Sequence, residues 1–270
     1  ETGKEGAERQ QKLLTTVRSY GVRMLGPNCM GMINTNPSIN LNATFSNILP
    51  NPGNIAFATQ SGQLGSAILM YANTLNIGLS TFVSIGNRAD ISSNELLQYW
   101  EDDPDTDVVL LYLESFGNPR KFARIARGIT SKKPVVSVTS SSTTHRVRVS
   151  TSETGAMATD EAATEALFKQ AGIVRVDTLE DLFDTGNLLA TQPLPAGNRV
   201  AILSNAGGPG LLTAEACRAR GLQVPGLSES TLTKLSSVLS SRANPENPID
   251  TSADLTMDQY REALKLLLAD

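Results

Sequence analysis

The amino-acid sequence predicts an α/β fold made of doubly wound parallel sheets, and three of its features lead to this prediction. Short apolar runs alternate along the chain with segments of helical spacing. The runs lack polar alternation, as in residues 108–113, which is typical of strands buried on both faces of a parallel sheet. Glycine-rich turns directly follow two of the runs, where a strand passes into a helix.

The first 52 residues are expected to lie outside the first sheet. Residues 1–18 have the pattern of an amphipathic helix, and residues 22–25 have that of a short strand. One helix and one strand cannot enclose a core. Residues 1–34 are therefore interpreted as the last part of a domain whose front part is absent. Three prolines within residues 35–52 indicate a linker.

Residues 53–192 predict one complete doubly wound domain. Strands are expected at residues 55–59, 81–85, 108–113, 134–138 and 173–176. Helices are expected at residues 64–75, 94–100, 120–129, 161–171 and 179–190. The Ser- and Thr-rich stretch at residues 139–152 predicts a long exposed loop.

A linker at residues 192–197 separates this domain from a second α/β domain over residues 197–270. Its strands are expected at residues 200–203 and 222–224, and its helices at residues 211–220 and 229–239. Residues 260–270 end in a helical pattern with no strand after it, so this domain is interpreted as incomplete.

The composition argues against several classes of protein. Lys and Arg number 23 and Asp and Glu number 27, and the resulting net charge of −4 is unlike that of a general nucleic-acid binder. No apolar run approaches the roughly 18 residues of a membrane span. Two cysteines, Cys29 and Cys217, and a single histidine argue against a disulfide framework and a metal site. This cysteine usage favours a cytoplasmic protein.

Two glycine turns are candidate phosphate-binding sites. The first contains Ser61, Gly62, Gln63 and Gly65, and the second contains Gly207, Gly208 and Gly210. The amides at the start of a helix attract an anion, and the helix dipole adds to this attraction. Neither turn is a P-loop, because no Gly-Lys-Ser/Thr follows. The alternative is that these glycines only permit close packing of strand and helix.

Five motifs occur in order along the chain and together identify a resemblance. They are Gly-Pro-Asn-Cys-Met-Gly at 26–31, Thr-Gln-Ser-Gly-Gln-Leu-Gly at 59–65, Ser-Ile-Gly-Asn-Arg-Ala-Asp at 84–90, Asn-Ala-Gly-Gly-Pro-Gly at 205–210 and Asn-Pro-Ile-Asp at 247–250. With these motifs the chain resembles the NDP-forming acyl-CoA synthetases, relatives of succinyl-CoA synthetase. The resemblance implies that residues 1–34 end a CoA-binding Rossmann domain. It also implies that residues 53–192 and 197–270 are flavodoxin-like domains.

The resemblance also implies a chemistry. In this family an acyl phosphate forms from an acyl-CoA, a histidine takes the phosphoryl group, and a mobile loop carries it to ADP. Glu114 matches the family glutamate that orients the histidine, and both glycine turns would stabilise the phosphohistidine. Asn28, Cys29 and Asn87 would lie on the side of CoA and the acyl phosphate.

The ligands and partners that the resemblance implies are CoA or acyl-CoA, ADP or ATP with Mg in the intact complex, and an ATP-grasp domain or subunit. A homo-oligomer is expected, and no nucleic-acid or membrane partner. None of the ligands is expected to bind tightly to these residues alone, because the front part of the Rossmann domain is absent.

The chain departs from the family at the phosphoacceptor. The family segment Ser-His-Thr-Gly-Ala is Ser-Glu-Thr-Gly-Ala at residues 152–156, so Glu153 occupies the histidine position. A phosphorylated carboxylate is much more labile than a phosphorylated imidazole, which argues against a ligase cycle. His145, eight residues earlier, is interpreted as a solvated loop residue.

The resemblance offers a function for such a chain. Some members without the histidine are fused to a GNAT domain and act as protein lysine acetyltransferases. The expected function is therefore an acyl-CoA-sensing or regulatory module of such an acetyltransferase. An active ADP-forming acetate or acyl-CoA ligase subunit and a ligand-free interaction scaffold are the alternatives.

Overall fold

The computed structural model describes residues 3–139 and 161–270. The expected loop at 139–152 therefore lies almost wholly outside the described residues, as do His145 and Glu153. The chain forms two compact units, Glu1–Pro193 and Leu194–Asp270. None of the described helices combines the length and the apolar character needed to cross a membrane.

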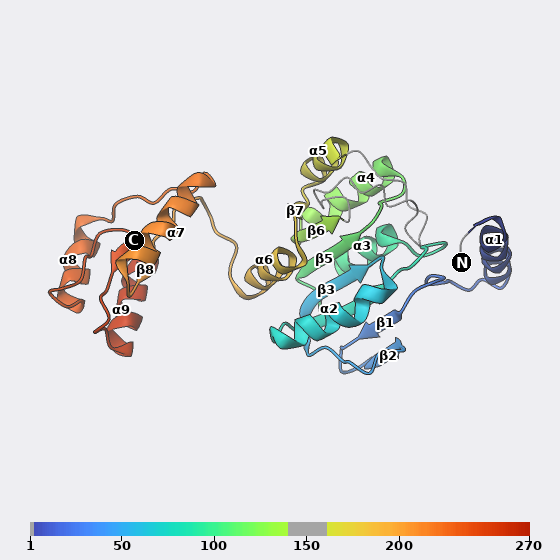
Figure 1. The fold of residues 1–270 in the computed structure, drawn as a ribbon, viewed down its shortest axis with the longest axis horizontal. Coiled ribbons are helices and arrows are strands. Elements are labelled where there is room, and N and C mark those ends of the chain that lie inside the picture. The colour runs from blue at the N-terminus through green and yellow to red at the C-terminus, as the bar shows by residue number, and fades with distance from the viewer. Residues whose placement is uncertain (1–2, 140–160) are drawn as a thin grey trace. The chain divides into compact units, whose positions relative to one another are not determined.

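The first unit contains a seven-stranded sheet with the order β2-β1-β4-β3-β5-β6-β7 (Figure 1). Its parallel part consists of β3 (Pro52–Thr59), β4 (Leu79–Ser84), β5 (Val108–Leu113), β6 (Val135–Thr139) and β7 (Val174–Val176). These are the five expected strands: the bounds of β5 match the expected ones, and those of the other four differ by one to three residues. They confirm the predicted fold class.

Helices cover both faces of this sheet (Figure 1). One face carries α2 (Gly62–Thr74) and α6 (Leu179–Thr191). The other carries α3 (Ser93–Asp102), α4 (Pro119–Thr130) and α5 (Glu161–Ala171). The helix after β3 thus lies on the face opposite the helices after β4, β5 and β6. This difference defines a switch point between β3 and β5, where ligands bind in such sheets.

Two hydrophobic cores lie on the two faces of the sheet, and strand residues alternate between them. Ala56 of β3 belongs to one core, whereas Phe57 belongs to the other and stacks 5.5 Å from Phe183 of α6. On the face that carries α3, α4 and α5, Trp100 of α3 is fully buried, and its indole N–H donates to the Thr81 hydroxyl at 2.8 Å. Burial on both faces explains why these strands lack polar alternation.

The N-terminal segment differs from its expected form. Residues 22–25 form no strand, whereas β1 (Gly31–Asn34) and β2 (Leu41–Thr44) make an antiparallel addition to the sheet beside β4. Residues 31–34 cover the open edge of β4 and bury Ile33 in the core. The expected linker at 35–52 contains β2, because this strand pairs with the free edge of β1. The preceding helix α1 (Gly3–Ser19) contacts the turn after β4 through Asn87 and Asp90.

The second unit is a small α/β assembly. Its two-stranded parallel sheet pairs β8 (Leu203–Ser204) with β9 (Ile249–Asp250). Its helices are α7 (Gly207–Ala219), α8 (Glu229–Val238) and α9 (Met257–Leu268). The expected strand at 222–224 is wrong: this segment makes only a single bridge, from Gln223 to Arg199. The first expected strand forms at 203–204 rather than at 200–203.

The Asn-Pro-Ile-Asp motif of the second unit has a structural role in this fold. The Asn247 side-chain oxygen accepts from the Ile202 amide at 3.0 Å. The Asn247 side-chain N–H groups donate to the carbonyls of Val200 and Pro225, both at 2.9 Å. One side chain thus connects three backbone segments that have no continuous strand pairing of their own.

Candidate functional site

Three turns meet at the carboxyl edge of the parallel sheet. They follow β3, β4 and β5, which are neighbours in the order β4-β3-β5. The Ile85 amide donates to the Thr59 carbonyl at 2.8 Å, and the Gln60 amide donates to the Tyr112 carbonyl at 3.1 Å, so backbone bonds hold the three turns together. The motif residues that follow these strands are therefore brought to one place, at the switch point of the sheet.

The turn after β3 starts helix α2 with a side-chain cap. The Ser61 backbone is extended, and its hydroxyl accepts from the Leu64 amide at 3.3 Å. This is the geometry of a serine N-cap. The first four amides of a helix have no intrahelical acceptor, and Ser61 satisfies that of Leu64. The dipole at the start of this helix favours negative charge.

Gln60 sets the position of the turn after β5. Its side chain is 1% exposed, and its carbonyl oxygen accepts from the amides of Glu114 at 2.7 Å and Ser115 at 2.9 Å. The guanidinium of Arg88 holds the same turn from the other side, donating to the Ser115 carbonyl and, at 3.0 Å, to the Ser115 hydroxyl. These contacts fix the backbone from which the Glu114 side chain projects.

Glu114 interacts electrostatically with two neighbouring side chains. Burial lowers the pKa of Arg88, and the nearby Glu114 charge opposes that shift. Burial raises the pKa of Tyr112, and the Glu114 charge raises it further. The guanidinium of an arginine remains charged at neutral pH. Arg88 is therefore a cation near Glu114.

The turns at 26–31 and 84–90 pack directly on one another. Asn28 adopts a left-handed backbone, with φ of 55°, and its side-chain N–H donates to the Asn87 side-chain oxygen at 3.3 Å. The Asn87 amide donates to the Pro27 carbonyl at 2.9 Å. A Cβ on Gly86 would lie 2.3 Å from the Asn28 carbonyl oxygen, so only glycine permits this approach.

Cys29 is placed at the site without the features of a nucleophile. Burial raises the pKa of its thiol, which disfavours the thiolate at neutral pH. The Cys29 thiol donates to the Leu25 carbonyl at 3.7 Å. We therefore regard Cys29 as part of the wall of the site.

A cavity of about 320 Å³ opens where these turns meet. It is lined by Asn28, Cys29, Phe45, Gln60, Ser61, Gly62, Gln63, Ser66 and Glu114. Six of these residues were predicted as site residues, and the structure brings them together from two motifs, at 26–31 and 59–65, and from Glu114 after β5. Sequence reasoning assigned no role to Phe45, Gln60 or Ser66. Gln60 lay within a quoted motif, whereas Phe45 lay in the expected linker and gave no signal.

Two other predicted residues lie outside the lining. Asn87 adjoins the site through its hydrogen bond with Asn28. Gly65 faces the core, where a Cβ would lie 2.3 Å from the Met30 sulfur and 3.2 Å from the Phe82 ring. The packing alternative therefore accounts for Gly65, whatever its amide contributes.

The second glycine turn starts α7 in the second unit. Its N-cap is Ala206, which makes no side-chain cap hydrogen bond. A Cβ on Gly207 would lie 3.0 Å from a carboxylate oxygen of Asp250, whereas one on Gly208 would meet nothing within 4 Å. Since Gly207, Gly208 and Gly210 belong to a different compact unit from Ser61, a shared phosphate site stays a prediction.

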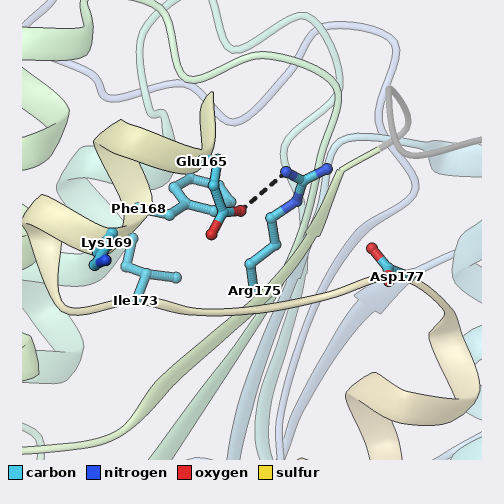
Figure 2. A pocket seen from close by; sticks show the side chains of 6 residues that line it. All are labelled: Glu165, Phe168, Lys169, Ile173, Arg175 and Asp177. Carbon is cyan, nitrogen blue, oxygen red and sulfur yellow. Dashed lines mark hydrogen bonds and ion pairs between the residues drawn. The ribbon is translucent and has the colours of Figure 1, made fainter. Parts of the chain in front are cut away.

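A second cavity, of about 340 Å³, contains two of the predicted site residues, Asn28 and Asn87, between the turn at 26–31 and α1. Two more cavities contain none of them. One of about 350 Å³ lies between α5 and β7 (Figure 2). Figure 2 shows Glu165 reaching across it to Arg175, with 3.0 Å between carboxylate and guanidinium. A larger cavity, of about 720 Å³, lies in the second unit between residues 195–203 and α9. Within residues 3–139 and 161–270, no group of His, Cys, Asp and Glu is arranged to hold a metal ion.

Comparison with known proteins gives a consistent result. The family model described as "Succinyl-CoA ligase like flavodoxin domain" matches residues 52–189. The chain is 40% identical over 270 residues to the α subunit of acetate–CoA ligase [ADP-forming] II from Pyrococcus furiosus, covering all of this chain and 58% of that relative. It is 41% identical over 249 residues to acetate–CoA ligase [ADP-forming] from Methanocaldococcus jannaschii, covering 92% of this chain and 35% of the relative.

A solved structure shows the same fold over the whole chain. It is the dinucleotide-forming acetyl-coenzyme A synthetase 1 of Ca. Korarchaeum cryptofilum, in complex with phosphate and ADP. The TM-score is 0.91 at 33% identity, covering 100% of this chain and 59% of that one. This chain thus spans less than two thirds of the length of each of these relatives.

Proposed function

Because the chain belongs to the succinyl-CoA ligase-like family, in its NDP-forming acyl-CoA synthetase α-type branch, we propose that it serves in an ADP-forming acyl-CoA ligase. In this function the cavity at the switch point holds the phosphoryl group of an acyl phosphate. The relatives named above are ligases, so they favour this function over a regulatory acetyltransferase module.

One observation carries the proposal: the start of α2, Asn28 and Glu114 line a single cavity. The amides after Ser61 and the N–H groups of Asn28 and Gln63 are donors of the kind that phosphate oxygens accept from. Glu114 stands on the rim, and its carboxylate is suited to orient a phosphoacceptor rather than to hold the phosphate itself. Arg88 offsets that charge without lining the cavity.

The remaining parts of the reaction belong to partners. In the direction of acyl-CoA formation, CoA displaces inorganic phosphate from the acyl phosphate, and acyl-CoA and phosphate leave. In the direction of ATP synthesis, inorganic phosphate displaces CoA from the acyl-CoA, and the phosphoryl group of the resulting acyl phosphate passes to ADP. CoA, ADP or ATP, Mg and the ATP-grasp partner are proposed for the intact complex, in line with a relative that binds phosphate and ADP. For residues 1–270 alone we expect weak CoA binding. Assembly into a homo-oligomer stays a prediction.

The test is reconstitution. The protein is combined with an ATP-grasp subunit of the family and supplied with ATP, acetate and CoA. Formation of acetyl-CoA with matching release of ADP is the expected result. Gln60→Ala, which releases the Glu114 backbone, should lower the rate at least tenfold. Asn187→Ala, which changes an exposed residue of α6 outside the motifs and the cavity lining, serves as the matched control.

A second candidate rests on Glu153. With glutamate where the family has its phosphoacceptor histidine, the chain would bind the acyl phosphate or acyl-CoA without completing turnover. The family resemblance predicted such a module within a fused GNAT acetyltransferase. The ligase relatives give that fusion no support.

The same reconstitution separates the two candidates. If no acetyl-CoA forms while inorganic phosphate still binds, the second candidate is favoured. Glu153→His should then introduce an acid-labile, base-stable phosphoryl label when ATP and the partner are present. Acetyl-CoA formation by the unaltered chain would reject the second candidate.

A further inference from the structure

We propose that Phe45 is the wall against which the acyl group of the substrate packs, so that the site selects uncharged, apolar acyl chains over dicarboxylic ones. The inference rests on the proposed function, because it takes the phosphoryl group to lie at the start of α2. It adds the substrate class and the residue that discriminates it.

The composition of the cavity wall leads to Phe45. Among the nine described lining residues, Phe45 is the only large apolar side chain. The others supply amide, hydroxyl, thiol and carboxylate groups or, at Gly62, bare backbone. Phe45 is 77% exposed when only the part of the chain that the structure describes is considered. An aromatic ring that borders a polar cavity offers apolar contact area that the remaining wall lacks.

The geometry of an acyl phosphate places its chain near that ring. The acyl carbon is joined to the phosphorus through one bridging oxygen, so both groups must occupy the same small space. At about 320 Å³ the cavity is at the small end of ligand pockets, which are about 300–1,000 Å³. With the phosphoryl group on the polar wall around Ser61, the chain extends toward the apolar part, at Phe45.

Hydrogen bonds within the segment that carries Phe45 order its backbone. The Asn42 side-chain oxygen accepts from the Thr44 amide at 3.1 Å and from the Thr44 hydroxyl at 2.7 Å. The Thr44 hydroxyl accepts from the Ser46 amide at 3.1 Å, and the Ser46 hydroxyl accepts from the Ile48 amide at 3.0 Å. Ile48 packs against the core. The backbone from which the Phe45 ring projects is therefore already ordered, which reduces the cost of ordering this segment when a ligand binds.

The charge of the lining excludes one class of acyl group. Glu114 is the only charged side chain among the described lining residues. A dicarboxylic acyl group would bring a second carboxylate to a wall that provides no cation from those residues. The site should therefore prefer a butyryl chain to a succinyl chain, although the two have the same number of carbons.

The experiment measures how affinity depends on chain length. Calorimetry gives the Kd of the protein for inorganic phosphate, acetylphosphonate, butyrylphosphonate and succinylphosphonate, which are stable analogues of acyl phosphates. For the unaltered protein we expect butyrylphosphonate to bind more tightly than acetylphosphonate, by up to about fourfold per buried methylene. Succinylphosphonate should bind at least tenfold more weakly than butyrylphosphonate.

Three variants test the residue. Phe45→Ala should leave phosphate binding within about twofold and abolish the gain with chain length, whereas Phe45→Leu should retain most of the gain. Tyr20→Ala is the matched control, since Tyr20 is an aromatic residue, 79% exposed, outside the cavity lining. Because Phe45 is mostly exposed, Phe45→Ala should keep the thermal midpoint of the unaltered protein.

The outcomes separate this inference from the function on which it rests. A chain-length gain that persists undiminished in Phe45→Ala, with phosphate still bound, overturns the role of Phe45 alone. Equal affinity for butyryl- and succinylphosphonate overturns the proposed exclusion of dicarboxylic groups. Failure of the unaltered protein to bind phosphate overturns the phosphate site and this inference together.

Discussion

Two glycine turns start helices in this protein, one in each compact unit, and their surroundings differ. At the start of α2 the Ser61 hydroxyl accepts from the Leu64 amide, and the turn lines a cavity. At the start of α7 the N-cap is Ala206, without a side-chain cap hydrogen bond, and the Asp250 carboxylate lies beside Gly207. The first turn thus combines a capped helix with a cavity that it lines, whereas the second turn has no side-chain cap.

The difference arises from residues that the glycine pattern does not contain. Gln60, just before the first N-cap, is buried and binds two amides of the turn after β5. Asn205, just before the second N-cap, is exposed. A carboxylate near a helix N-terminus occupies the electrostatic position that an anion would take. Glycine spacing alone therefore does not identify an anion site; the neighbouring strands must supply the remaining wall.

The largest expected effect comes from the residues before the two N-caps. Gln60→Ala removes the acceptor of two part-buried amides, and unsatisfied groups of this kind cost about 1–3 kcal/mol each. We expect the first unit to lose about 3 kcal/mol of unfolding free energy, measured by denaturant titration.

Asn205→Ala is the matched change in the second unit. Because Asn205 is exposed, its loss should alter stability by less than about 0.5 kcal/mol. Equal losses in the two variants would mean that Gln60 does not distinguish the turns.

The next largest effect is a difference in stability between two alanine substitutions, at Gly65 and Gly210, the glycines four residues after each N-cap. Gly65→Ala would place a Cβ 2.3 Å from the Met30 sulfur, so we expect a loss of about 1–2 kcal/mol from overpacking. Gly210→Ala would place its Cβ 3.5 Å from Pro248, an ordinary contact, and should gain about 0.5 kcal/mol from helix propensity. Denaturation midpoints of both variants measure this contrast. Stabilisation by Gly65→Ala would contradict the packing role of this glycine.

The central strands were predictable because burial on both faces leaves a strong local signal. The apolar runs around Phe57 and Leu110 correspond to β3 and β5, and the helices between them have clear apolar periodicity. The pairing of β1 with β4 was not predictable in this way. Residues 31–34 form a strand because β4 offers an open edge, a tertiary cause that short-range patterns do not record.

The candidate site was predictable where a motif carried it. Ser61, Gly62 and Glu114 lie at strand ends, and the rule for parallel sheets places strand ends together. Phe45 was not predictable, because its place at the cavity depends on how β2 joins the sheet. Gly65 shows that a glycine in a phosphate-type motif can also be required for packing, here against Met30 and Phe82, and its phosphate-binding role stays a prediction.

A smaller effect compares the two N-caps directly. Ser61→Ala removes a cap hydrogen bond and should cost the first unit about 1 kcal/mol. Ala206→Ser should stabilise the second unit by up to about 1 kcal/mol, because the Ala206 backbone, at φ −150° and ψ 132°, already has the extended form of an N-cap. Thermal melts of each variant measure the two changes. No gain from Ala206→Ser would show that the second turn is held by other contacts.

The smallest expected effect is on the pH dependence of stability, and it is tested at one carboxylate in each unit, Asp90 and Asp270. The Asp90 carboxylate accepts from Arg23 at 2.8 Å and from the Met24 amide at 2.9 Å, and chiefly the Arg23 bond lowers the Asp90 pKa. In the second unit the Ser228 hydroxyl is the first cause that lowers the pKa of Asp270.

A carboxyl group whose pKa is lower in the folded state stabilises the fold at pH values above its unfolded-state pKa, which is about 3.9 for Asp. That stability is lost as the pH falls through the folded-state pKa. Both units should therefore lose stability below about pH 4. The Asp90 side chain is 9% exposed, whereas Asp270 is exposed, so solvent screens the contribution of Asp270 more strongly.

Denaturant titrations at pH 7 and pH 3 measure the acid loss, which is the unfolding free energy lost between these two pH values. This loss should be smaller in Asp90→Asn than in the unaltered protein. Asp270→Asn should change that loss less. An unchanged acid loss in Asp90→Asn would mean that the bonds to Arg23 and Met24 do not tie residues 18–24 to the turn after β4.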